Sequence, residues 1–130
     1  MPSLVGSEMC IRDRDYFDLF LQTGKQFDAV VCNNDTMALG VIDSCKKNGI
    51  SGVPVLGIDA TADGCAAIQA GDMAFTVYQS GSGQGEAAVK AAIALGSGGT
   101  TQGMEGLSDD GLYVWVPFEK VDSSNVADYQ

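Results

Sequence analysis

Histidine is absent from the 130-residue sequence, which removes the commonest general base and metal ligand of proteins. Basic residues are also scarce: seven Lys and Arg stand against 17 Asp and Glu, for a net charge of −10. A surface of this sign argues against a nucleic-acid backbone or an anionic membrane as partner. No run of about 18 apolar residues could span a bilayer, and no charged-then-apolar signal segment opens the chain. We therefore expect either a cytoplasmic protein or one whose native beginning is missing.

Motifs of nucleophilic and metal chemistry are missing as well. The cysteines show no Cys-x-x-Cys spacing, so we expect small buried residues rather than a zinc site; they are Cys10, Cys32, Cys45 and Cys65. A disulfide between Cys45 and Cys65 is conceivable in geometry, but no feature indicates one. There is no Gly-x-Ser-x-Gly elbow, and the glycine-rich run 81–85 lacks the lysine of a phosphate loop. We expect no enzyme, no metal and no cofactor.

Short apolar runs alternate with helical patterns along the first two thirds of the chain, beginning with the stretch 27–40. The runs predict strands over 28–32, 53–58 and 73–78, and the patterns predict helices over 36–47 and 61–70. Runs that are continuously apolar are typical of a parallel sheet covered on both faces. The sequence therefore predicts an α/β fold with an open parallel sheet and flanking helices.

Each of the three expected strands ends in a polar side chain: Asn34, Asp59 and Gln79. Open α/β sheets bind ligands at the carboxyl ends of their strands, so we expect a binding site there. An amide presents both a donor and an acceptor, which suits a hydroxyl-rich ligand. Asn33 and Asn34 are equally explained as turn and cap residues, and both interpretations stay open. We expect Asp35 to accept hydrogen bonds from the first N–H groups of the helix that follows.

The other segments carry weaker signals. We expect the end of a helix over 15–22, a flexible joint over 81–85, a helix over 86–95, a mobile loop over 96–104, a strand over 112–116 stopped by Pro117, and a last helical turn through Val126. Residues 1–14 show no periodicity and no cap signal, and they resemble a translated sequencing-adapter read. We therefore expect them to be a non-native or disordered leader.

Four motifs occur in order between Phe27 and Tyr129: Val-x-Asn-Asn-Asp-x-Met-Ala-Leu-Gly, Val-x-Gly-Ile-Asp-Ala, Gly-Asp-x-x-x-Thr-Val-x-Gln and Val-Pro-Phe. With this order and spacing, the chain resembles the C-terminal portion of type I periplasmic sugar-binding proteins. The galactose/glucose-binding and ribose-binding proteins are nearest in pattern. The resemblance implies a monosaccharide-binding component of an ABC sugar transporter, which works outside the cytoplasmic membrane, captures a hexose or pentose between two lobes and docks on a permease.

The same resemblance implies roles for particular residues and segments. Asn34, Asp59 and Gln79 would be sugar ligands. The chain would divide into part of the C-terminal lobe (15–80), a hinge with a helix of the first lobe (81–96), and a loop, return strand and tail (97–130). The rest of the first lobe would lie outside this chain.

Two points limit the resemblance. The galactose branch more often has Asn where Gln79 stands, so the identity of the sugar stays open. Asp28 falls at the position of an acidic calcium ligand, but the loop with the remaining ligands is not in this chain, so we predict no metal site. The alternative is the ligand-binding domain of a LacI-type transcription regulator, against which the strand before Asp59 lacks the Pro-Glu-Asp lead-in typical of those proteins.

Overall fold

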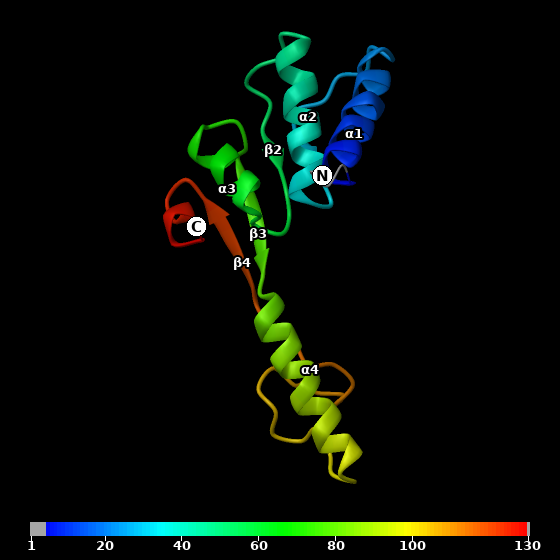
Figure 1. Cartoon of the computed structure of the whole chain (residues 1–130), viewed down its shortest axis with the longest axis vertical. Helices are drawn as coiled ribbons and strands as arrows, with labels where there is room; N and C mark the ends of the chain where they lie inside the picture. The colour runs from blue at the N-terminus through cyan, green and yellow to red at the C-terminus, as the bar shows by residue number, and fades with distance from the viewer. Residues whose placement is uncertain (1–4, 130) are drawn as a thin grey trace. The chain divides into compact units, whose positions relative to one another are not determined.

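The computed structural model describes residues 5–129, with side chains from Arg12 onward. Its elements are α1 (Val5–Leu21), β1 (Val30–Val31), α2 (Asp35–Lys47), β2 (Val55–Leu56), α3 (Ala62–Gln69), β3 (Phe75–Gln79), α4 (Gly81–Gly96), β4 (Phe118–Asp122) and the 3₁₀ helix η1 (Val126–Tyr129) (Figure 1). The chain forms two units: the first contains residues up to Tyr78 and from Glu119 onward, and the second contains Gln79–Phe118. None of the described helices is long and apolar enough to cross a membrane.

The first unit is built on an open sheet with the strand order β1-β2-β3-β4. β1 pairs with β2 and β2 with β3, both in parallel, with Val30 opposite Val55 and Leu56 opposite Phe75. β4 lies next to β3, and the arrows of these two strands point in opposite directions (Figure 1). The expected α/β fold, with an open sheet and flanking helices, is therefore confirmed: β1, β2 and β3 are parallel, and β4 runs in the opposite direction. The strands β1, β2 and β3 are each shorter than the apolar run that predicted them.

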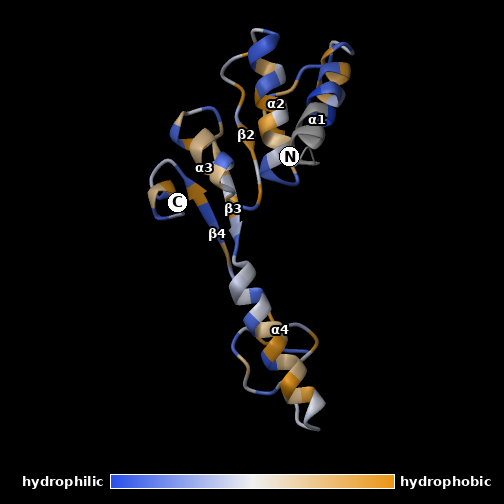
Figure 2. Cartoon of the chain, viewed as in Figure 1, coloured by the Kyte–Doolittle hydropathy of each residue, from blue (hydrophilic) through white to orange (hydrophobic). Residues whose placement is uncertain are grey.

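Helix α2 packs on the sheet and contributes one of its faces to the core. Ala38, Val41, Ile42 and Cys45 are buried, which is the i, i+3, i+4, i+7 stripe of an amphipathic helix. α2 packs against α1, α3 and β2, and Figure 2 shows the apolar residues that these elements contribute. This stripe is the core face of the helix that was predicted over 36–47.

The three cysteines with described side chains, Cys32, Cys45 and Cys65, are buried free thiols. They are core residues, as expected, and Cys45 and Cys65 are not joined in a disulfide. Cys10 lies outside the described side chains.

Helix α1 begins at Val5, so it extends through most of the segment 1–14 that we expected to be non-native or disordered. Residues 1–4 lie outside the described residues. Near the end of α1, the rings of Phe17 and Phe20 lie 5.6 Å from the ring of Phe27, between centroids. These edge-to-face contacts fasten the end of the helix to the segment that leads into β1.

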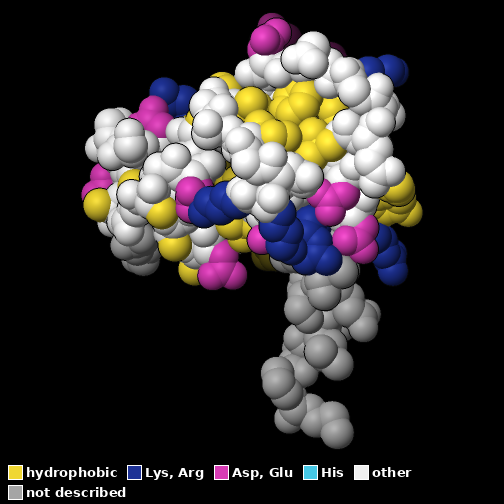
Figure 3. All heavy atoms as spheres, turned by 90° about the horizontal axis from the view of Figure 1, so that it is seen from above, with side chains coloured by type: hydrophobic (Ala, Val, Ile, Leu, Met, Phe, Trp, Pro, Cys, Tyr) yellow, Lys and Arg dark blue, Asp and Glu magenta, His cyan; other side chains and the backbone are white. Residues whose placement is uncertain are grey.

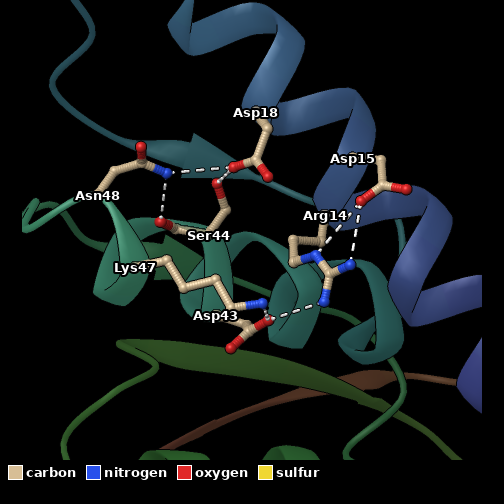
Figure 4. A network of polar contacts seen from close by, with 7 residues as sticks. All are labelled: Arg14, Asp15, Asp18, Asp43, Ser44, Lys47 and Asn48. Atoms are coloured by element: carbon tan, nitrogen blue, oxygen red, sulfur yellow. Dashed lines mark hydrogen bonds and ion pairs between the residues drawn. The ribbon is translucent and has the colours of Figure 1, made fainter.

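Polar contacts join α1 to α2 (Figure 4). The buried hydroxyl of Ser44 donates to the carboxylate of Asp18, and the amide of Asn48 donates to the same carboxylate over 3.2 Å. Arg14 lies 3.5 Å from Asp43. Exposed ion pairs of this kind contribute little to stability. Figure 3 shows Lys and Arg side chains beside Asp and Glu on the face seen from above, so this face is not a patch of one sign.

The second unit departs from the sequence predictions at its start. Helix α4 begins at Gly81, because the hydroxyl of Ser80 caps it by accepting from the N–H of Gly83 over 3.0 Å. The flexible joint expected over 81–85 is therefore wrong, and these residues form the first turns of the helix. The expected helix over 86–95 is its continuation. Val89 and Ile93 are exposed, and Figure 2 shows the apolar colour of this part of α4.

The strand expected over 112–116 is also wrong. Within that segment the structure has one antiparallel bridge, between Leu107 and Val114. The strand β4 comes after Pro117 instead, and its Val121 is fully buried in the core of the first unit. Val121 therefore enters the core, whereas the more apolar run 112–116 stays outside the sheet. The expected last helical turn is confirmed as η1.

Candidate functional site

Asn34 follows β1 and is the N-cap of α2. Its Oδ1 accepts from the N–H of Met37 over 2.8 Å, with an extended backbone at φ −158° and ψ 168°. The expectation that Asp35 caps this helix is therefore wrong. The cap uses the oxygen of the amide and does not use its two N–H donors. A capping role and a ligand-binding role for Asn34 are thus compatible.

Asp35 has a different structural role, which was not predicted from the sequence. Its carboxylate is fully buried and accepts three hydrogen bonds. Oδ2 accepts from the N–H of Thr61 over 2.7 Å and from its hydroxyl over 3.1 Å, and Oδ1 accepts from the hydroxyl of Thr76 over 2.5 Å. The backbone N–H of Asp35 donates to the carbonyl of Ile58 over 2.8 Å. One side chain therefore joins the start of α2 to the start of α3 and to β3.

Two glycines make room for this carboxylate. A Cβ on Gly57 would lie 2.2 Å from Oδ1 of Asp35, and a Cβ on Gly64 would lie 2.2 Å from Oδ2. Both contacts are far shorter than van der Waals separation. Residues 57 and 64 must therefore be glycine for Asp35 to keep its three bonds. This pair of glycines, one directly after β2 and one early in α3, is a sequence signal that could have revealed the buried carboxylate.

Asp59 follows β2 in a strained loop. Its φ is 112° and that of Ala60 is 51°, values that side chains other than glycine rarely adopt. Such residues cost about 1–3 kcal/mol each and persist where the surroundings hold them, often at ligand sites. The side chain of Asp59 is exposed. Partial burial, and secondarily the charge of Asp35, raise the pKa of Asp59.

Three successive backbone N–H groups hold this loop. That of Asp59 donates to the carbonyl of Val77 over 2.8 Å, and that of Ala60 donates to the hydroxyl of Thr76 over 3.3 Å. The third, on Thr61, donates to the buried carboxylate described above. Residues of β3 and the first residue of α2 therefore hold the backbone of the loop that carries Asp59.

The structure brings two of the three predicted site residues to one edge of the sheet. Asn34 and Asp59 follow adjacent parallel strands, and the bond between Asp35 and Ile58 joins the two loops directly. Gln79 is the last residue of β3 and the first residue of the second unit. The arrangement offers amide and carboxylate groups for hydrogen bonding. Among the described residues, no group of three or more His, Cys, Asp or Glu is arranged to hold a metal ion.

Comparison with known proteins shows the family to which the chain belongs. The family model for the periplasmic binding protein domain matches residues 13–100. The chain is 38% identical over 104 residues to a xylitol-binding protein of Mycolicibacterium smegmatis, a match that covers 80% of this chain and 28% of the relative. It is 32% identical over 119 residues to the D-galactose/methyl-galactoside binding periplasmic protein of Haemophilus influenzae, covering 89% of this chain and 35% of the relative.

Among solved structures, the chain is similar to an ABC transporter solute binding protein from Bacillus halodurans C-125 with bound myo-inositol. The TM-score is 0.73 and the identity 34%, and the match covers 92% of this chain and 39% of that chain. The chain thus spans about a third of the length of the curated relatives it matches. On the family match, the identities and the shared fold, this chain belongs to the periplasmic binding protein domain family.

Proposed function

We propose that this chain forms part of the monosaccharide-binding component of an ABC sugar transporter, with Asn34, Asp59 and Gln79 as ligands of a hexose or pentose. The observation that carries the proposal is the placement of Asn34 and Asp59 at the carboxyl edge of the sheet, on adjacent loops. The names of the relatives support it, because xylitol, galactose and myo-inositol are all rich in hydroxyl groups.

The chemistry of these side chains suits capture without reaction. The Asp59 carboxylate can accept from two sugar hydroxyls, and charge-assisted hydrogen bonds contribute roughly 1.5–3 kcal/mol each. The amides of Asn34 and Gln79 can donate to one hydroxyl and accept from another. The relatives named above are binding proteins, and we infer that this protein is likewise no enzyme.

The division into units supports the proposed hinge. The chain leaves the first unit after Tyr78 and returns to it at Glu119, so the boundary falls beside the proposed sugar ligand Gln79. In the proposal, residues 15–80 belong to the C-terminal lobe, 81–96 to a first-lobe helix that joins it through a hinge beside Ser80, and 97–130 to a loop, return strand and tail. A docked permease is the proposed partner.

The proposed location is extracytoplasmic, and the cysteines are suited to it. Burial raises the pKa of Cys45 and Cys65, and it raises that of Cys32 to about 11. Buried thiols that stay protonated are poor nucleophiles and oxidise slowly. Free thiols of this kind are therefore compatible with an oxidising compartment. No observation favours the LacI-type alternative.

The test is calorimetric titration of a family-length protein, in which residues 13–129 are joined to the preceding part of the Bacillus halodurans relative. The titrants are myo-inositol, galactose, glucose, ribose and xylose. We expect micromolar or tighter binding of at least one. Asp59→Ala should weaken that binding by one to two orders of magnitude or more, given about 1.4 kcal/mol per factor of ten. Asp63→Ala, an exposed aspartate four residues away, is the matched control. Equal losses in the two variants, or no binding of any titrant, would contradict the proposal.

A further inference from the structure

The hydrogen bonds around Asp35 have a fixed direction. A carboxylate only accepts, so the hydroxyls of Thr61 and Thr76 must both point their protons toward it. Each hydroxyl oxygen is then left to accept. That of Thr61 accepts from the N–H of Gly64 over 3.1 Å, and that of Thr76 accepts from the N–H of Ala60 over 3.3 Å. The buried charge therefore orients both hydroxyls for their backbone partners.

These bonds converge on the loop that carries Asp59. Thr76 holds the N–H of Ala60, and Asp35 holds the N–H of Thr61. The first of these bonds holds the loop between the two residues with positive φ, and the second holds it immediately after them. Without them, the backbone at residues 59 and 60 could relax toward ordinary φ values, and the exposed carboxylate would point elsewhere.

We infer that Asp35, acting through Thr76 and Thr61, is a positioning residue that sets the direction of the Asp59 carboxylate at the sugar site. The nature of the ligand rests on the proposed function, whereas the positioning of the loop rests on the hydrogen bonds given above. Asp35 and Thr76 are both fully buried, so neither side chain can touch a ligand. Their influence on binding must pass through the loop.

The first experiment compares Thr76→Val with Thr76→Ser in the family-length protein. Valine has nearly the shape of threonine but no hydroxyl, whereas serine keeps the hydroxyl that links Asp35 to Ala60. Amide hydrogen exchange is measured without ligand. We expect the N–H of Ala60 to exchange at least tenfold faster in Thr76→Val and to be restored in Thr76→Ser. The N–H of Ala70, which donates to the carbonyl of Ala66 at the far end of α3, should exchange as in wild type.

The second experiment measures affinity for the titrant that wild type binds best. We expect Thr76→Val to weaken binding about tenfold and Thr76→Ser to weaken it less than twofold. In an Asp59→Ala background, the Thr76→Val change should have no further effect, because the residue through which it acts is gone. A merely structural role would lower the melting temperature, but it would not make the effect of Thr76→Val on affinity depend on Asp59.

The outcomes separate the inference from the proposed function. Unchanged exchange at Ala60 in Thr76→Val, or an equal affinity loss with and without Asp59, would overturn the positioning role. Faster exchange at Ala60 in a protein that binds none of the titrants would contradict the proposed function and support the positioning of the loop. If Thr76→Val does not fold, Thr61→Ala is compared with Thr61→Ser in the same two measurements.

Discussion

Replacing Gly57 by alanine should destabilise the chain through one identifiable clash. The new Cβ would lie 2.2 Å from Oδ1 of Asp35 and 3.2 Å from its Cα. The carboxylate must then move away from Thr76, which donates to that oxygen over 2.5 Å. Overpacking costs about 1–3 kcal/mol and the loss of a hydrogen bond to a charged group about 1.5–3 kcal/mol, so we expect about 3–5 kcal/mol in total.

The assay is urea unfolding of the chain followed by circular dichroism. With an m value of about 1.5 kcal/mol/M, a loss of about 3 kcal/mol lowers the midpoint by about 2 M. Gly85→Ala is the control, because no heavy atom lies within 4 Å of its added Cβ. Gly85 lies in α4, where the change to alanine should be neutral or should stabilise the helix by about 0.5–1 kcal/mol. A Gly57→Ala midpoint equal to that of wild type would refute the account of the buried carboxylate.

Three further predictions concern protonation. Because folding raises the pKa of Asp59, the free energy of unfolding should fall as the pH rises from the ordinary aspartate pKa through the raised one. Sugar affinity should increase over the same pH range, because the carboxylate becomes ionised. Asp59→Asn should abolish both trends, which are measured by melting and by calorimetric titration at several pH values. Hydrogen bonding to Lys120 lowers the pKa of Asp122, so the contribution of Asp122 to stability is present above the ordinary aspartate pKa and is lost in acid. The free energy of unfolding of Asp122→Asn should therefore fall less steeply than that of wild type as the pH is lowered. The hydrogen bond to Glu119 raises the pKa of Tyr129 to about 12, and ultraviolet titration of Glu119→Gln should return it toward 10.

Local patterns in the sequence were sufficient to predict the helices and strands in which buried residues recur at a regular spacing. The alternation of apolar runs and helical stripes predicted the parallel strands and α2, because one buried stripe per helix leaves a period that can be read directly. Polar residues at the strand ends could be predicted for the same reason. Asn34 and Asp59 follow β1 and β2, and in a parallel sheet such positions share one edge.

Long-range partners could not be predicted in this way. Asp35 has its partners 26 and 41 positions away, so nothing within its own helix distinguishes it from a cap residue. The same is true of β4, where Val121 enters the core although the neighbouring segment 112–116 is more apolar. The start of α4 depended on one hydroxyl, that of Ser80, which outweighed three glycines in the first turns.

The return of the chain at Glu119 has a consequence for how the protein is made. The core of the first unit needs Val121 and Val126, which the ribosome adds more than 40 residues after Tyr78. Between Tyr78 and Glu119 the ribosome must add 118 − 79 + 1 = 40 residues, which takes about 2–8 s at 5–20 residues per second. During that interval β3 lacks its neighbour β4 and the first unit lacks part of its core, so a chain truncated before Val121 should be more exposed to proteolysis than the whole chain.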